Sequence, residues 1–155
     1  MEPDLKNTWV DSQLGSFNPG PTAVIETRKS NPANRADVVF GFMRLVFGFL
    51  FACHGAQKLF GLLGGHAQLH DPWLLTAGVL EFVGGILVAF GLFTRPVAFV
   101  LCGEMAVAYF KAHFPGGIWP IMNHGEPAVL YCFFFLYLMV RGAGPLSLDG
   151  LRGKA

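Results

Sequence analysis

The sequence predicts an all-α fold: a four-helix transmembrane bundle with up-down-up-down topology, preceded by a polar N-terminal extension. Of its 155 residues, 53% are hydrophobic and only 14% are charged, whereas an ordinary soluble domain carries about 25% charged residues. Nine of the charged residues lie in 1–37 and four in 141–155, which leaves eight for the 103 residues between. Such a charge-poor section is typical of helices solvated by lipid.

Four apolar runs in this middle section approach the roughly 20 residues that a membrane-spanning helix needs. They extend from Val38 to about Leu59, from Trp73 to Phe93, from Pro96 to Phe114 and from Gly125 to Val140. The fourth run is short, about 24 Å at about 1.5 Å per residue. We therefore expect it to cross nearly upright or through locally thinned lipid.

Residues that begin or end helices separate these runs. Asp71 is placed to cap the second helix, and Pro72 suits its first turn. Residues 94–96 form a tight turn, which makes the second and third helices antiparallel neighbours. Residues 115–123 form the longest loop between the runs.

Lysine and arginine gather on one side of the predicted membrane. That side collects Lys6, Arg28, Lys29, Arg35, Arg95, Arg141, Arg152 and Lys154, and the other has only Lys58 and Lys111. By the positive-inside rule both termini are cytoplasmic, and we expect a bacterial inner or plasma membrane. The predicted organisation is a polar arm (1–37), a four-helix domain (38–141) and a cytoplasmic tail (142–155).

The arm of residues 1–37 is not needed by a four-helix bundle. It does not resemble a secretory signal, because Glu2 and Asp4 replace a basic start and no apolar core precedes Val38. Its composition favours a disordered tail, whereas residues 22–25 could add as a strand or dock on a partner. We expect the arm to bind other subunits of a membrane complex.

Seven ionisable residues lie within or at the ends of the predicted spans: Arg44, His54, Lys58, Glu81, Glu104, Lys111 and Glu126. Each would cost several kcal/mol in hydrocarbon unless it faces protein or water, so each is a candidate functional residue. Arg44 and Lys58 return to nearly the same helix face, and His54 lies one turn before Lys58. The first helix therefore has a polar face that must look into the bundle.

Two roles remain open for these residues. The acids and bases could pair with one another and fix the register of the helices. Alternatively, a buried glutamate relays protons or hydrogen-bonds the carbonyl headgroup of a quinone, with basic side chains completing the pocket. On that interpretation the candidate catalytic residues are Glu81 and Glu104, and the candidate cofactor-binding residues are Arg44, His54, Lys58 and Glu126.

Other functional classes find less support. A formal charge of +1 gives no case for a nucleic-acid partner. The histidines lie mostly in loops, so neither a haem nor a metal site is expected. Cys53, Cys102 and Cys132 lie on three different predicted helices without a C-x-x-C pair, so no dithiol redox centre is expected.

Small and aromatic residues have simpler interpretations. Gly78, Gly84 and Gly85 give the second helix a side on which another backbone can approach closely, which predicts helix packing. The run Phe133-Phe134-Phe135 is expected to face lipid or the membrane interface.

Several short motifs follow one another over residues 38–150. They are Arg44 with Gly48, His54-Gly55 and Lys58, then Glu81-x-x-Gly-Gly with Gly91 and Arg95, then Asn123-x-Gly-Glu126, and finally Gly142-x-Gly-Pro-x-Ser-Leu-Asp149. In their order and spacing these motifs resemble the DoxX family of small four-helix integral membrane proteins.

The resemblance implies a link to electron transfer. Members of the DoxX family are described as quinone-linked oxidoreductase subunits, as in thiosulfate oxidation, or as membrane partners of oxidative-stress and thiol enzymes. We therefore expect a subunit of a respiratory or photosynthetic electron-transfer complex that binds a quinone between its helices. The alternative is a purely structural accessory subunit that stabilises a larger complex without redox chemistry.

Overall fold

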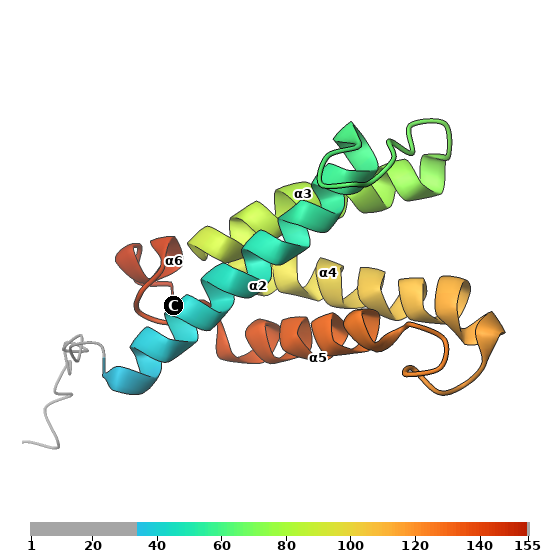
Figure 1. The fold of residues 1–155 in the computed structure, drawn as a ribbon. Helices are drawn as coiled ribbons and strands as arrows, with labels where there is room; N and C mark the ends of the chain where they lie inside the picture. Colours follow the sequence, from blue (N-terminus) through green and yellow to red (C-terminus); the bar gives the residue numbers. More distant parts are fainter. Residues whose placement is uncertain (1–33, 155) are drawn as a thin grey trace, which may run out of the picture. The chain divides into compact units, whose positions relative to one another are not determined.

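The computed structural model describes residues 34–154, and this part of the chain is helical without strands. Its long helices are α2 (Arg35–Phe60), α3 (Pro72–Phe90), α4 (Thr94–Ala108) and α5 (Glu126–Arg141), and a short α6 (Leu148–Leu151) follows (Figure 1). After α4 the chain continues through a π-helical segment, η1 (Tyr109–His113), and a 3-10 turn, η2 (Phe114–Gly116).

The predicted all-α protein with apolar helices of membrane-spanning length is confirmed. The segments Arg35–Phe60, Pro72–Phe90 and Thr94–Gly116 are long and apolar enough to cross a membrane. Helix α5, with 16 residues, is shorter than the usual span of about 20 residues. The predicted partner-binding arm lies mostly outside the described residues, and only its last residues, 34–37, appear as the start of α2.

Local signals in the sequence explain where the helices begin and end. The side chain of Asp71 accepts hydrogen bonds from the backbone N–H groups of Trp73 and Leu74, which confirms the predicted cap of α3. Helix α3 ends before Phe93, where the second run was expected to end, because Gly91 adopts a left-handed conformation with φ of 66°. Such a residue closes a helix at little cost only when it is glycine.

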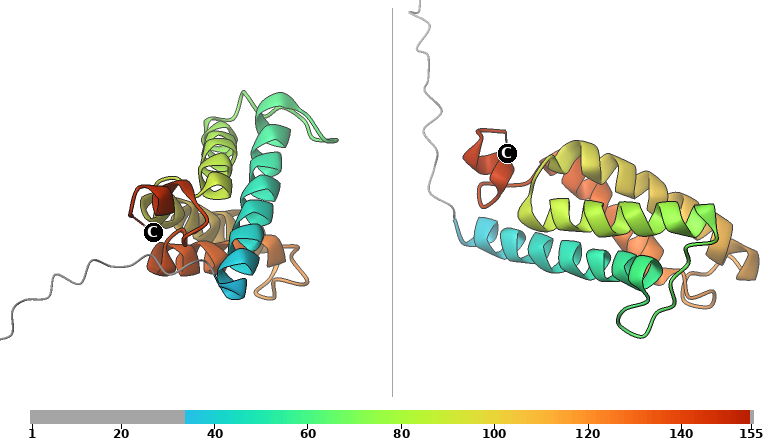
Figure 2. Two further views of the ribbon diagram at one scale, coloured as in Figure 1. Left: turned by 90° about the vertical axis from the view of Figure 1, so that its left-hand side faces the viewer. Right: turned by 90° about the horizontal axis from the view of Figure 1, so that it is seen from above.

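The helices form two hairpins, α2 with α3 and α4 with α5 (Figure 1). We call the end that carries residues 61–71 and 117–125 the loop end, and the end that carries residues 91–93 and α6 the tail end. The hairpins diverge towards the loop end in Figure 1. Figure 2 shows the same helices end on and from above, with α6 beside the turn between α3 and α4.

Helices α2 and α3 touch through glycine. A Cβ atom added to Gly48 would lie 2.5 Å from the backbone nitrogen of Ala89, and one added to Gly55 would lie 2.3 Å from that of Phe82. A Cβ on Gly85 would likewise meet the backbone of α2, 2.5 Å from the nitrogen of Ala52. The predicted close approach of a backbone to the second helix is confirmed at Gly85, where the partner is α2. Gly84 instead packs against the side chain of Leu101 on α4, and Gly78 packs against side chains of α2.

The remaining core lies between α2, α4 and α5. Phe51, Leu101, Phe135 and Leu138 are almost completely buried there. The expectation that residues 133–135 face lipid is therefore wrong in part, since Phe133 is 66% exposed and Phe135 is 0% exposed. Consecutive residues on a helix point in directions about 100° apart, so one run of phenylalanines serves both lipid and core.

Replacing Gly55 by alanine is expected to lower the free energy of unfolding by about 1–3 kcal/mol, because the new methyl group has no room between two backbones. Thermal unfolding of the purified protein in detergent measures the change. Gly103→Ala is the matched control, since no atom lies within 4 Å of a Cβ built there. Equal losses for both variants would contradict close packing of α2 on α3.

Candidate functional site: a polar cavity at the loop end

A cavity of about 240 Å³ lies among α2, α3, α4 and α5 near the loop end. We call it the polar cavity. Phe51, Met105 and Ala128 contribute apolar surface to it. Its polar lining comes from six side chains on five different segments of the chain: His54, Lys58, Glu81, His113, His124 and Tyr131.

Lys58 and Glu81 form an ion pair across the α2–α3 contact. The ammonium group of Lys58 donates a hydrogen bond to Oε1 of Glu81. Glu81 is only 4% exposed, and its Oε2 atom has no hydrogen-bond partner among the described residues. The glycine contacts at Gly55 and Gly78 hold the two backbones close on either side of this pair. Glu81 thus has one occupied and one free carboxylate oxygen.

His54 and Tyr131 face each other across the cavity from α2 and α5. Their rings meet edge to face with centroids 6.2 Å apart. Tyr131 also packs against Phe51 and Phe135, which fixes its ring against the core. Neither the Tyr131 hydroxyl nor the His54 ring has a hydrogen-bond partner within residues 34–154. Both groups therefore remain available to water or to a ligand.

Two further histidines reach the cavity from the loop end. The Nδ1 atom of His113 lies 3.1 Å from the backbone oxygen of Asn123, which leaves Nε2 for the cavity. His113 ends the π-helical segment η1, and its wider turn changes which face the following side chains occupy. His124 lies in a left-handed conformation with φ of 58°, next to the start of α5.

Glu104 lies in a different place from the other candidate residues. It lines a separate cavity of about 170 Å³ between α3 and α4, together with Trp73, Thr76 and Leu80. Both carboxylate oxygens of Glu104 are buried and have no hydrogen-bond partner among the described residues. Glu81 and Glu104 thus do not share one cavity, although both lie near the middle of their helices.

Arg44 lies at the tail end, where its guanidinium group binds backbone carbonyls. It donates to the oxygens of Val88, Ala89 and Leu146 at 2.6, 2.7 and 2.7 Å. The first two carbonyls lie in the last turn of α3, whose C-terminal end favours a cation, and that of Val88 also accepts the N–H group of Gly91. Arg44 is 3% exposed and does not line the polar cavity. Arg44 therefore connects α2 to α3 and to the tail through these hydrogen bonds.

Glu126 and Lys111 lie near the loop end but outside the polar cavity. Glu126 occupies the first turn of α5 and is exposed. Lys111 places its ammonium group 3.7 Å from the centre of the Trp73 ring, a cation–π contact that joins η1 to the start of α3. Of the predicted set, the cavity therefore gathers His54, Lys58 and Glu81.

Known proteins resemble this chain in sequence. A family model described as DoxX matches residues 40–114. Over 115 residues the chain is 46% identical to an uncharacterized protein of Haemophilus influenzae, an alignment that covers 70% of this chain and 86% of that protein. The chain belongs to the DoxX family.

A second relative of this DoxX protein carries a functional name. The chain is 30% identical over 116 residues to the Bacillus subtilis protein named "Putative oxidoreductase CatD", with 69% of this chain and 81% of that protein covered. No solved structure matches the chain.

Sequence reasoning missed three side chains of the polar cavity of this DoxX protein. His113 and His124 border the loop predicted at 115–123 and receive no role from the sequence, and Tyr131 is not among the predicted site residues. The signal available was the position of Tyr131 on α5, four residues before the buried Phe135, which places both on one face. For the histidines there was no comparable signal, because η1 and the 117–125 loop determine where they point.

The absence of a C-x-x-C pair predicts no dithiol redox centre, yet two cysteines on different helices meet in the structure. Cys102 on α4 and Cys132 on α5 place their Sγ atoms 3.7 Å apart. In contrast, no group of three or more histidine, cysteine, aspartate or glutamate side chains within residues 34–154 is arranged to hold a metal ion.

The tail of this DoxX protein is anchored by Asp149. Its carboxylate accepts hydrogen bonds from the backbone N–H groups of Phe93 and Thr94 at 3.0 and 2.8 Å, where α4 begins without a cap of its own. The backbone N–H group of Asp149 itself donates to the backbone oxygen of Gly91. Burial raises the pKa of Asp149, but the two N–H groups and nearby Arg152 outweigh burial and hold it below its ordinary value.

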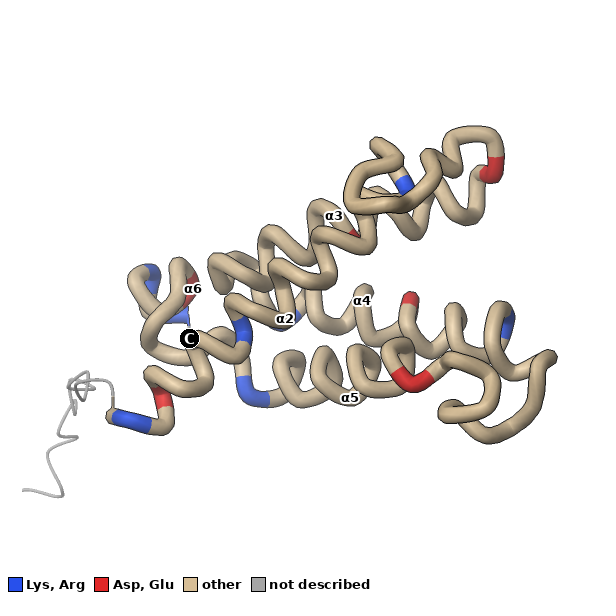
Figure 3. Tube along the Cα trace, in the orientation of Figure 1, with Lys and Arg blue, Asp and Glu red and all other residues tan. Residues whose placement is uncertain are grey.

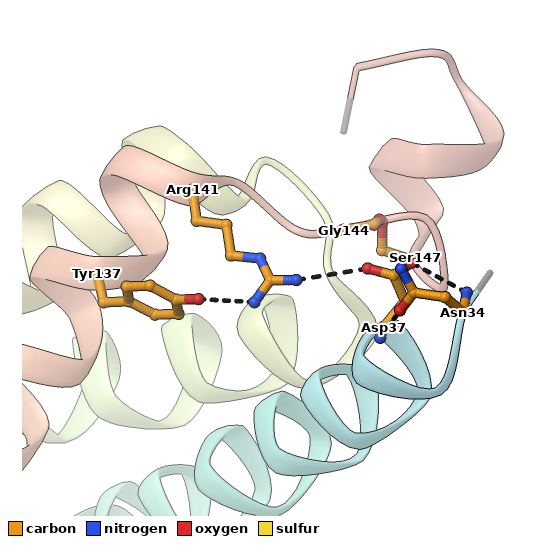
Figure 4. Close-up of polar contacts among 6 residues, drawn as sticks. All are labelled: Asn34, Asp37, Tyr137, Arg141, Gly144 and Ser147. Atoms are coloured by element: carbon orange, nitrogen blue, oxygen red, sulfur yellow. Dashed lines mark hydrogen bonds and ion pairs between the residues drawn. The ribbon is translucent and has the colours of Figure 1, made fainter. Parts of the chain in front are cut away.

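A second set of contacts ties α2 to the end of α5 (Figure 4). Arg141 donates to the Tyr137 hydroxyl at 2.6 Å and pairs with Asp37 at 3.4 Å. Asp37 and Asn34 cap α2 reciprocally. Close by, the hydroxyl of Ser147 donates to the oxygen of Gly144 at 2.5 Å, which shapes the tail before α6.

Because the pKa of Asp149 is lowered in the folded protein, its contribution to stability is complete above the ordinary value of 3.8 and is lost as the pH falls through the folded value. Stability should therefore decline on acidification below about pH 4, and Asp149→Asn should remove part of that decline. At neutral pH the variant should lose about 1–2 kcal/mol with the charged hydrogen bonds. Unfolding curves at several pH values test this, and an unchanged pH profile would contradict it.

Proposed function

We propose that this DoxX protein is a subunit of an electron-transfer complex and binds the headgroup of a quinone in the polar cavity. The observation that carries the proposal is the composition of that cavity. It combines an aromatic and aliphatic surface from Phe51 and Met105 with unpartnered polar groups from His54 and Tyr131. A quinone ring is flat and apolar, so it suits the apolar surface of the cavity. Its two carbonyl oxygens accept hydrogen bonds, so they suit the polar groups.

The size of the polar cavity suits a ring rather than a whole lipid. Its volume of about 240 Å³ falls below the roughly 300–1,000 Å³ of typical small-molecule sites. In the proposed arrangement the headgroup enters between the hairpins and the isoprenoid chain stays in lipid. The Lys58–Glu81 pair then provides a charge and a free carboxylate oxygen for proton exchange as the quinone is reduced or oxidised.

We also propose a membrane topology for the helices. Helix α5 crosses the membrane as a fourth, short span, which gives an up-down-up-down bundle. Figure 3 shows the basic residues of the described part concentrated at the tail end. By the positive-inside rule this end, with both termini, faces the cytoplasm. The polar cavity then opens near the opposite face of a bacterial inner membrane, and residues 1–37 bind partner subunits on the cytoplasmic side.

A structural accessory role is the second candidate. The ion pair of Lys58 with Glu81 and the three carbonyl contacts of Arg44 satisfy much of the buried charge without any ligand. On this alternative the bundle stabilises a larger complex through its lipid-exposed helices. It requires no quinone, so the two candidates differ in a direct binding measurement.

Replacing Tyr131 by phenylalanine should weaken quinone binding about 2- to 12-fold, because one hydrogen bond worth about 0.5–1.5 kcal/mol is lost while the ring remains. Isothermal titration calorimetry of the full-length protein in detergent with a short-chain ubiquinone analogue measures the affinity. The same comparison with His54→Phe tests the second unpartnered donor.

Two matched controls make the same chemical changes away from the cavity. Tyr137→Phe removes a hydroxyl from the same helix at its tail end, and His70→Phe removes an imidazole from the exposed 61–71 loop. Both should bind quinone as the native protein does. Absence of saturable binding in the native protein, or equal losses in site and control variants, would refute the quinone site and favour the structural role.

A further inference from the structure

The polar cavity does not involve the cysteines, yet two of them meet between α4 and α5. The Sγ atoms of Cys102 and Cys132 lie 3.7 Å apart, and the Cys132 thiol donates to the backbone oxygen of Cys102 at 3.5 Å. We propose that Cys102 and Cys132 form a dithiol that a lipid-soluble quinone oxidises to an interhelical disulfide. The pair would give the bundle a two-electron redox centre of its own.

The geometry needs little change to close this bond. A disulfide joins sulfur atoms about 2.05 Å apart, so the two thiols must approach by about 1.7 Å. Rotation about the side-chain bonds supplies part of such a shift. Helices α4 and α5 are already neighbours that Arg95 ties together at the tail end, where it donates to the oxygen of Val140 at 3.0 Å. The disulfide therefore joins segments that the fold already holds together.

Both cysteines are half-buried rather than enclosed, and Cys102 is open to the outside of the bundle. A groove of about 340 Å³ runs along α4 and α5 beside Cys102, lined by Phe99, Gly103 and Leu136. Gly103, which has no side chain, borders the same groove as Cys102. The groove shares no residue with the polar cavity. A flat apolar molecule dissolved in the bilayer can thus reach Cys102 without entering the polar cavity.

The position of the pair determines which oxidant suits it. Both cysteines lie near the middle of their helices, where lipid surrounds the bundle, so a lipid-soluble oxidant suits the pair better than a water-soluble one. A quinone takes up protons together with electrons. Two S–H bonds break and one S–S bond forms, while the two electrons and two protons pass to the two quinone oxygens and give the quinol. Atoms and electrons balance without a further reactant.

The experiment uses the full-length protein, reduced and then freed of reductant, and incubated without oxygen with tetramethylbenzoquinone. This quinone has no unsubstituted ring carbon to which a thiol adds. Free thiols are then counted by maleimide mass-tagging after unfolding in detergent, and quinol is measured by absorbance. We expect the count to fall from three per chain to one, with one quinol formed per chain, and dithiothreitol to restore all three thiols.

Variants of each cysteine separate this result from non-specific oxidation. Cys53 on α2 has no thiol neighbour among the described residues, so Cys53→Ser should form quinol as the native protein does and retain no free thiol afterwards. Cys102→Ser and Cys132→Ser, or the alanine variants if serine disturbs folding, should form no quinol. Three free thiols after quinone treatment, or disulfide-linked dimers in place of monomers, would overturn the proposal. The thiol count is independent of quinone affinity at the polar cavity, so the two proposals fail separately.

Discussion

The Lys58–Glu81 ion pair is the interaction on which the architecture of the loop end depends. A charged group inside a bilayer must be paired or hydrogen-bonded by protein or water. Removing one member of a buried ion pair leaves the other charge uncompensated, at a cost of about 3–5 kcal/mol. The pair forms because glycines bring α2 and α3 almost into backbone contact. Close packing through glycine thus permits the ion pair, in which Glu81 is buried and Lys58 is partly exposed.

The two ends of the protein use their polar groups differently. At the tail end, Arg44 binds carbonyl groups in the last turn of α3, and Asp149 binds N–H groups at the uncapped start of α4. These contacts hold the tail in place. At the loop end the hairpins diverge (Figure 1), and Oε2 of Glu81 at the polar cavity has no hydrogen-bond partner among the described residues. At the tail end Nε of Arg44 and Oγ1 of Thr94 likewise lack a partner there, although other hydrogen bonds of the tail join it to α2 and α4.

Much of this arrangement could be predicted from the sequence. Three of the spans follow from apolar run length, and the start of α3 follows from Asp71 and Pro72. The polar face predicted for α2 lies inward at Arg44, which is buried, whereas His54 is exposed although it lines the polar cavity. Two features could not be predicted, because they depend on how helices are rotated against one another. Glu104 faces a cavity separate from that of Glu81, and Cys102 meets Cys132. His113 depends on a π-helical turn that periodicity does not reveal.

A double-mutant cycle on the ion pair tests the central claim most directly. The free energy of unfolding is measured in detergent for the native protein, Lys58→Met, Glu81→Leu and the double variant. If the two charges pair inside the bundle, each single substitution lowers the free energy of unfolding by about 3–5 kcal/mol. The double variant then loses much less than the sum of the two single losses. Additive losses would contradict the account, because they would mean that the two charges do not interact.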